Sequence, residues 1–301
     1  MPNRSLNIEC VVDARAEVAE SPVWSVDEQV LYWADIYGGG RGGRLNRYDP
    51  ASGANTHWQF DAPLGSFGLR TAGGMVLALQ SGFHRFDPAA NALARIAQPE
   101  PERPNNRLND GRCDRAGRFW CGSMRDPADP AQPTGTLHRL DPDGTSTPML
   151  DGLFVTNGLA FGPDDRTLYV SDSIASVRTI WAFDFDLGAG TIANRRVFVD
   201  THGMDGRPDG AAVDADGCYW MAANDGWALA RFTPRGRLDR TIRVPVAKPA
   251  MLAFGGRDLR TIFVTSIRPK GRDLADQPQA GGVFAVEGAG IQGLPEPMFG
   301  G

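Results

Sequence analysis

The sequence has few of the side chains from which several common kinds of site are built. Among 301 residues there are four histidines and four cysteines. The histidines are scattered, and Cys10, Cys113, Cys121 and Cys218 form no C-x-x-C pair and have no histidines at zinc-finger spacing. A structural zinc site and a Ser-His-Asp centre are therefore not indicated. We expect the cysteines to be buried, reduced thiols; a Cys113–Cys121 bridge is the alternative.

Charge and hydropathy exclude two further classes of protein. The formal charge is 31 − 36 = −5 and there is no basic tract, whereas nucleic-acid binders carry clustered Lys and Arg. No apolar stretch approaches the roughly 20 residues of a membrane span. The first residues show no charged-then-apolar signal peptide. We therefore expect a cytoplasmic protein that binds neither nucleic acid nor a membrane.

Residues that interrupt helices are abundant instead. The chain has 37 Gly and 22 Pro, and this excess argues against a mainly helical protein. A phrase made of a short apolar run, an Asp- and Gly-rich turn and β-rich runs recurs six times, at intervals of about 40 to 50 residues. The copies span residues 22–49, 73–87, 109–141, 157–186, 209–234 and 251–286.

Repeats of this length, with three or four strands each, are typical of a β-propeller, and six copies predict six blades. A two-sheet sandwich has no need of a six-fold repeat, and a solenoid repeat would be shorter. The opening strand Leu6–Val12 precedes the first full copy, so we expect it to pair with the last blade and close the ring. Residues 1–301 then form one all-β propeller domain.

Polar side chains stand at the starts of several inner strands. Glu20, Asn109, Asn157 and Asp209 each come directly before an apolar run. In a propeller these starts meet at one face of the central channel, where uncompensated carboxylates are costly. A divalent cation such as Ca²⁺, Mg²⁺ or Mn²⁺, bound by oxygen ligands, would offset that cost. The alternative is that Asn and Asp before Gly only form turns.

The ends of the second strands return to the same face and predict further polar groups around this site. They are Asp35, Ser123, Asp172 and Asn224. Arg107, two residues before Asn109, is placed to bind carbonyl or hydroxyl oxygens at the same mouth. An exposed arginine in a salt bridge is the alternative for Arg107.

Five phrases, in order along the chain, carry a family resemblance. They are E-S-P-V-W (20–24), R-L-N-D-G-R-C-D-R-A-G-R-F-W (107–120), T-N-G-L-A-F (156–161), P-D-G-A-A-V-D-A-D-G (208–217) and Q-A-G-G-V-F-A-V (279–286). Over nearly its whole length the chain resembles the senescence marker protein/regucalcin/gluconolactonase family.

The resemblance implies a six-bladed propeller that hydrolyses aldonolactones with one bound divalent metal. By position, the family's metal ligands fall on Glu20, Asn157 and Asp209, and its substrate contacts fall on Arg107 and Asn109. The family often places a further substrate-binding acid shortly after a G-[ST]-M phrase. Here that phrase is residues 122–124 and the nearest acid is Asp126, one residue out of register. The Pro-rich segment 126–134 is then expected to overhang the mouth.

The expected reaction is hydrolysis of a gluconolactone- or pentonolactone-type ester to the aldonic acid, with Asp209 as general base as well as metal ligand. Two alternatives remain: a non-catalytic calcium-binding propeller of the regucalcin type, and a propeller arylesterase. The sequence leaves open which lactone is used, which metal is bound (Ca, Mg, Mn, Zn or Fe), and whether the protein is a monomer or a dimer.

Overall fold

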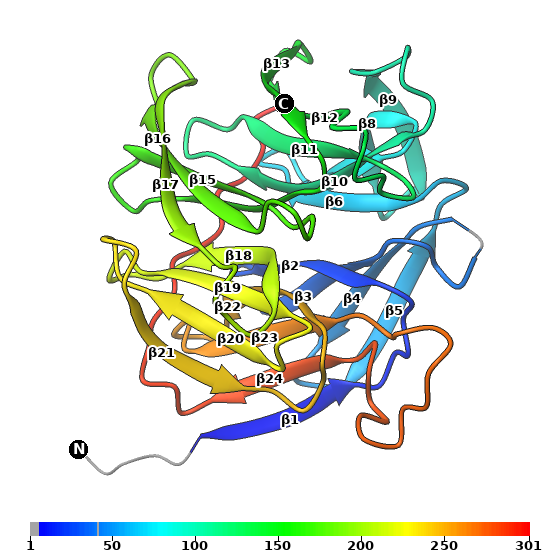
Figure 1. The fold of residues 1–301 in the computed structure, drawn as a ribbon. Coiled ribbons are helices and arrows are strands. Elements are labelled where there is room, and N and C mark those ends of the chain that lie inside the picture. The colour runs from blue at the N-terminus through cyan, green and yellow to red at the C-terminus, as the bar shows by residue number, and fades with distance from the viewer. Residues whose placement is uncertain (1–5, 41) are drawn as a thin grey trace.

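Six four-stranded antiparallel sheets surround one axis (Figure 1). The structure, a computed structural model, describes residues 6–40 and 42–301. Within these residues there are 24 strands and no helix, hence no helix that could cross a membrane. The all-β, six-bladed propeller that the repeats predict is confirmed.

The blades follow one another along the chain, and the strands of each blade are named from the innermost outward. Blade 1 is β2 (Ala19–Ser25), β3 (Val30–Asp35), β4 (Arg44–Asp49) and β5 (Ala54–Gln59); blade 2 is β6 (Leu64–Leu69), β7 (Met75–Leu79), β8 (Gly82–Asp87) and β9 (Ala92–Ala97); blade 3 is β10 (Asn106–Cys113), β11 (Phe119–Arg125), β12 (Gly135–Leu140) and β13 (Ser146–Leu153). Blade 4 is β14 (Thr156–Phe161), β15 (Thr167–Asp172), β16 (Thr179–Asp186) and β17 (Thr191–Asp200); blade 5 is β18 (Arg207–Val213), β19 (Tyr219–Asn224), β20 (Ala228–Phe232) and β21 (Leu238–Arg243); blade 6 is β22 (Pro249–Gly255), β23 (Thr261–Ser266), β24 (Val283–Glu287) and β1 (Asn7–Val12).

The first strand closes the ring, as expected. β1 pairs antiparallel with β24, from Asn7 opposite Glu287 to Val12 opposite Val283, so the outermost strand of blade 6 comes from the start of the chain. Pairing strands from the two ends of the fold in one sheet fastens the ring at the point of closure.

The repeat pattern misses the inner strand of blade 2. β6 (L-G-S-F-G-L) lies before the predicted second copy at 73–87. Its two glycines are poor strand formers, so the sequence does not indicate a strand there. The structure explains Gly65: a Cβ there would lie 2.2 Å from the backbone oxygen of Leu108 on the neighbouring inner strand. Close packing near the axis therefore selects glycine against β propensity.

Two buried aspartates fix the turns after inner strands β10 and β18. Asp114 accepts hydrogen bonds from the backbone N–H of Ala116 and Arg118 and from Trp120 Nε1 (2.9 Å). Asp214, six residues before Trp220, accepts the equivalent hydrogen bonds, and the bond from Trp220 Nε1 is 2.8 Å long. Each aspartate ties a tight turn to the strand that follows, which is why the D-x-x-G-x-x-W phrase recurs.

Apolar side chains fill the spaces between neighbouring blades. Buried clusters join strands of blades 1 and 2, 2 and 3, 3 and 4, 4 and 5, 5 and 6, and 6 and 1. Aromatic pairs lie across these contacts, for example Phe83 with Phe119 (ring centroids 6.1 Å apart) and Trp24 stacked on Phe263 (5.4 Å). The four cysteines are free thiols, so the expectation of reduced cysteines is confirmed and the Cys113–Cys121 bridge is wrong; three are buried as expected, whereas Cys10 is only partly buried.

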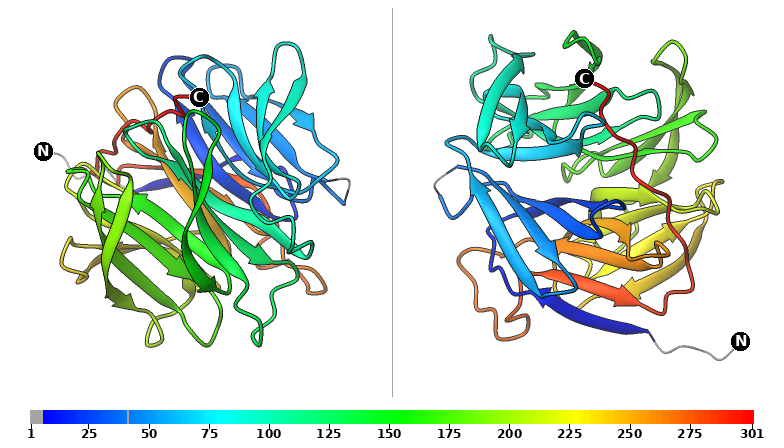
Figure 2. Two further views of the ribbon diagram at one scale, coloured as in Figure 1. Left: turned by 90° about the horizontal axis from the view of Figure 1, so that it is seen from above. Right: turned by 180° about the vertical axis from the view of Figure 1, so that it is seen from behind.

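After β24 the chain runs as an extended tail across the face of the ring opposite the predicted site (Figure 2). The backbone of Gln292 and Gly293 bonds the turns of blades 5 and 6, at Ala215 and Leu259. Further on, Phe299 N donates to Leu69 O of blade 2 (2.7 Å). The tail thus ties together turns from several blades.

We predict that Phe299→Ala lowers the free energy of unfolding by about 3–5 kcal/mol, because it leaves a cavity where a ring is 1% exposed in the core between blades 2 and 3. Denaturant unfolding measures the change. Leu93→Ala, on the outer strand of blade 2 and 44% exposed, is the control and should change stability little. An equal effect of the two substitutions would show that the tail does not hold the ring.

Candidate functional site

The predicted site residues lie at irregularities of the inner strands. In β2, β10, β14 and β18 the pairing with the second strand shifts register at one place. Those shifts lie between Glu20 and Val23, Leu108 and Gly111, Asn157 and Ala160, and Pro208 and Ala211. A bulge bends its strand and turns side chains out of the regular alternation. The repeated bulge therefore places Glu20, Asn109, Asn157 and Asp209 at the same level of the propeller.

The glycines that follow these residues belong to strands and not to turns. A Cβ on Gly210 would lie 2.3 Å from Met251 Cγ on the inner strand of blade 6. A Cβ on Gly111 would lie 2.6 Å from Ser66 Oγ of blade 2. The turn-forming alternative for the Asn-Gly and Asp-Gly phrases is therefore wrong, because the glycines permit neighbouring blades to approach at the axis.

A chain of hydrogen bonds joins four of the predicted side chains. Arg107 Nε donates to Asp126 Oδ2 (2.9 Å) and Arg107 Nη1 donates to Asn109 Oδ1 (2.5 Å). Asn109 Nδ2 in turn donates to Asn157 Oδ1 (2.9 Å). Arg107 is only 6% exposed, so the surface salt-bridge alternative for this arginine is wrong. The network fixes the direction of these four side chains, from blade 3 to blade 4.

Glu20 and Asp209 form a buried pair of acids. They are 8% and 6% exposed. Burial, with repulsion from Asp209 and Asp110, holds the pKa of Glu20 well above its ordinary value. Burial likewise raises the pKa of Asp209 to about 7, against the opposing effects of Arg207 and the Asn224 amide. Two carboxyl groups that resist ionisation together are a place where a cation would be strongly favoured.

Asp110 is a third acid beside this pair, and sequence reasoning did not single it out. It is 4% exposed, and burial raises its pKa to about 6. Its Oδ2 accepts from Leu159 N (2.9 Å), whereas Oδ1 has no hydrogen-bond partner among the described residues. The signal was present in the phrase R-L-N-D-G, where the bulge of β10 brings two consecutive polar side chains toward the axis.

Tyr37 is a second residue that the sequence did not reveal. It follows β3, and its hydroxyl donates to Asp126 Oδ2 (2.6 Å), while the Arg107 guanidinium lies 5.7 Å from its ring centroid. Asp126 thus lies at the mouth, bonded to both Arg107 and Tyr37 despite its offset from the family phrase. Nothing in a lone Tyr before a glycine-rich segment indicates this contact across the ring.

Of the four residues predicted at the ends of the second strands, one contacts the site and three make other contacts. Asn224 Nδ2 donates to Asp209 Oδ2 (2.5 Å). Asp172 accepts from backbone N–H groups of residues 154, 155 and 174, and Ser123 bonds Glu100 and the backbone of Thr136. Asp35 is buried, with its pKa raised by burial, and the backbone N–H groups near it oppose that rise. Only Asn224 is therefore placed to orient a candidate ligand.

The donor set at this level fits a hard divalent cation. Glu20 and Asp209 supply carboxylate oxygens, and Asn157 Oδ1 keeps a second lone pair beside its bond to Asn109. In the described part of the chain no three His, Cys, Asp or Glu side chains form a metal-binding group, which leaves the Asn157 amide as a candidate third protein ligand. All three are oxygen ligands, which suits Ca²⁺, Mg²⁺ or Mn²⁺.

A family model described as the SMP-30/Gluconolactonase/LRE-like region matches residues 18–268. The chain belongs to this family. It is 42% identical over 296 residues to a 6-deoxy-6-sulfogluconolactonase of Pseudomonas putida, covering 98% of this chain and 99% of that protein. It is 36% identical over 304 residues to chicken (Gallus gallus) regucalcin, covering 99% of each chain.

The fold of the family is shared as well. A crystal structure described as a calcium-binding protein, regucalcin, from Agrobacterium tumefaciens superposes with a TM-score of 0.89 at 26% identity, over 96% of each chain. The resemblance inferred from the five phrases is thereby confirmed. Relatives named as a lactonase and as regucalcin support a sugar lactone hydrolase while leaving the calcium-binding alternative in place.

We predict that a divalent cation stabilises this protein more as pH rises. The pKa values of Glu20 and Asp209 lie above those of an unfolded chain, so without a cation the folded state loses stability as pH rises through them. A cation binds the ionised pair and reverses that loss. The rise in Tm on adding Ca²⁺ or Mn²⁺ should therefore be larger at about pH 8 than at about pH 5.

Glu20→Gln combined with Asp209→Asn should remove most of this cation-dependent rise. Asp258→Asn, whose side chain is 66% exposed in a turn, is the matched control and should keep it. An undiminished rise in the double variant would place the cation elsewhere.

Proposed function

We propose that this protein is a metal-dependent sugar lactonase that hydrolyses an aldonolactone to the aldonic acid. The observation that carries the proposal is the buried network from Asp126 through Arg107 and Asn109 to Asn157, which sets an oriented guanidinium beside the acid pair. Support for the substrate class comes from the sulfogluconolactonase relative. Gluconolactone, a pentonolactone and 6-deoxy-6-sulfogluconolactone are the substrates to test first.

Glu20, Asn157 and Asp209 would hold one divalent cation. When bound, such a cation supplies Lewis-acid polarisation of a carbonyl oxygen and lowers the pKa of a water molecule. The relative described as calcium-binding supports this cofactor class.

The remaining residues position the substrate and accept a proton. Arg107 and Asn109 would bind hydroxyl oxygens and restrict the lactone to one orientation, which lowers the entropic barrier. Asp126 keeps the guanidinium in place through its bond to Nε and is a further contact for substrate hydroxyls. Asp209 Oδ1 would accept the proton of the attacking water, since its other oxygen is bonded by Asn224.

A calcium-binding propeller without catalysis is the second candidate, favoured by the identity to regucalcin. Acid release from a lactone in a pH-stat separates the two: a lactonase produces acid that a chelator abolishes and added metal restores. A propeller arylesterase would instead hydrolyse an aryl acetate in preference to any sugar lactone.

We predict that Asp209→Asn lowers kcat for the lactone by at least about 100-fold in metal-saturated enzyme, because the carboxylate that accepts the proton is lost. Lactone hydrolysis at saturating metal measures it, with bound metal quantified in the same samples. Asp258→Asn serves again as the control. Retention of most activity by a metal-loaded Asp209→Asn enzyme would remove Asp209 from the chemistry.

We predict that Arg107→Ala raises KM by about 10-fold or more while kcat changes less, because a charged hydrogen-bond donor to substrate oxygens is removed. Steady-state kinetics measures both constants. Arg260→Ala, with a side chain 52% exposed, is the matched control. An unchanged KM would mean that Arg107 does not contact the substrate.

A further inference from the structure

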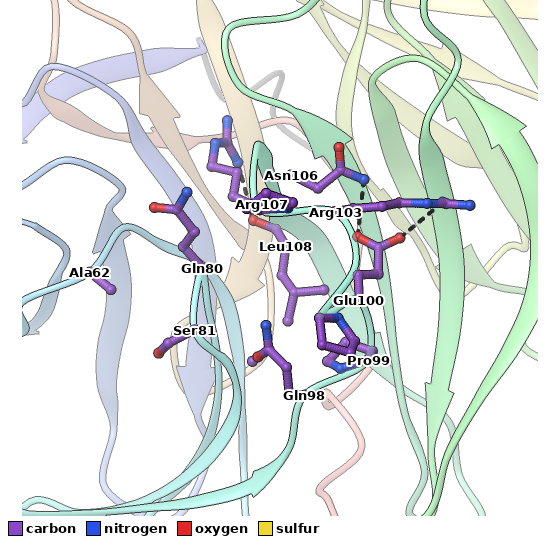
Figure 3. A pocket seen from close by; sticks show the side chains of 13 residues that line it. Ala62, Gln80, Ser81, Gln98, Pro99, Glu100, Arg103, Asn106, Arg107 and Leu108 are labelled. Carbon is purple, nitrogen blue, oxygen red and sulfur yellow. Dashed lines mark hydrogen bonds and ion pairs between the residues drawn. The ribbon is translucent and has the colours of Figure 1, made fainter.

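A pocket of about 310 Å³ opens between blades 2 and 3, directly beside Arg107 (Figure 3). It is formed by the segments that link β5 to β6, β7 to β8 and β9 to β10, and by the start of β10. These links lie on the same face of the ring as the candidate site. Arg107 and Leu108 belong to the pocket wall, and Asn109 of the hydrogen-bond network is the next residue along the strand.

The wall of this side pocket offers neutral polar groups that nothing else uses. Gln80, Ser81 and Gln98 line it, and their side chains have no hydrogen-bond partner among the residues the structure describes. In Figure 3 Leu108 extends toward Gln98, and Gln80 lies to one side of it. Two amides and a hydroxyl around an aliphatic floor present donors and acceptors together with a surface for C–H groups.

The charged residues of the pocket are engaged with one another. Glu100 Oε1 accepts from Ser123 Oγ (2.9 Å) and Oε2 accepts from Asn106 Nδ2 (3.0 Å). Arg103 Nη1 donates to Glu100, Thr134 O and Thr136 Oγ1. In Figure 3 Arg103 and Glu100 lie on the side of Leu108 away from Gln80. The glutamines and the serine are therefore the groups left to recognise a ligand.

Position decides which part of a ligand reaches this pocket. Leu108 of the pocket wall directly precedes Asn109 in β10, so the pocket begins about one residue, roughly 3.4 Å, from Asn109. A lactone whose ring hydroxyl groups are held by Arg107 and Asn109 would direct the end of its carbon chain past Leu108. The ring itself stays at the acid pair.

We infer that the side pocket binds the hydroxyl-bearing C5–C6 end of a hexono-1,4-lactone, through Gln80, Ser81 and Gln98. The inference rests on the proposed lactonase function and deepens it: it makes six-carbon lactones preferred over five-carbon ones. A pentono-1,4-lactone occupies the acid pair and Arg107 in the same way, but its side chain ends at C5 and leaves the rest of the pocket to water.

The test compares glucono-1,4-lactone with a pentono-1,4-lactone in the metal-loaded enzyme, because both have a five-membered ring and their side chains differ by one carbon. Gln80→Ala and Gln98→Ala should each lower kcat/KM for gluconolactone by about 5- to 10-fold, mainly through KM, because each removes one neutral hydrogen bond. Values for the pentonolactone should stay within about 2-fold. Both glutamines are at least partly exposed, so the fold should survive, and thermal unfolding checks it.

Gln292→Ala, an exposed glutamine of the tail on the opposite face, is the control and should leave both lactones unaffected. Equal losses for the two lactones, no loss for gluconolactone, or a wild-type preference for the pentonolactone would each overturn the inference. Those results leave the lactonase proposal standing. Absence of chelator-sensitive hydrolysis of either lactone by the wild-type protein would instead overturn the proposed function.

Discussion

Burial of the carboxyl groups of Glu20 and Asp209, with the repulsion that Asp209 adds at Glu20, is the constraint on which the centre of this molecule depends. Two acids from blades 1 and 5 are kept out of water by the ring around them, and burial makes each resist ionisation. The closure of the ring by β1 and β24 fixes the blades that hold the two acids. Protonation at low pH removes this cost, and a bound cation would remove it at higher pH, so binding and titration would be linked through one pair of groups.

Crowding at the axis explains how four inner strands carry polar residues to one level. Glycine at 65, 111 and 210 lets neighbouring backbones and side chains approach where a Cβ would clash. The adjacent bulges then turn Asn109 and Asp209 inward instead of leaving them in the regular alternation. Because bulge and glycine recur together, the site follows from the same repeat that builds the fold.

That coupling is the reason why the sequence could predict that Glu20, Asn109, Asn157 and Asp209 lie at one level of the ring: each occupies the same phase of a visible repeat, and Arg107 lies two residues before Asn109. Residues outside that phase of the repeat could not be predicted from the sequence. Tyr37 reaches Asp126 across the mouth from another blade, and only the three-dimensional path of its loop brings them within 2.6 Å. β6 was missed because packing against Leu108 overrode strand propensity. Asp172 and Ser123 have the right phase but bond groups within their own surroundings, which composition does not reveal.

Arg107 helps to distinguish a protein that only binds a cation from an enzyme that uses a cation in catalysis. Its positive charge opposes the rise in the pKa of Glu20, and the same charge repels a divalent cation bound nearby. A site built only to bind calcium would gain affinity by replacing this arginine with a neutral residue. Instead the chain holds the guanidinium in place with Asp126 and Asn109, almost fully buried. The arginine would lower the affinity for a cation. That loss is expected in an enzyme in which the cation and the guanidinium both bind oxygen atoms of the same substrate.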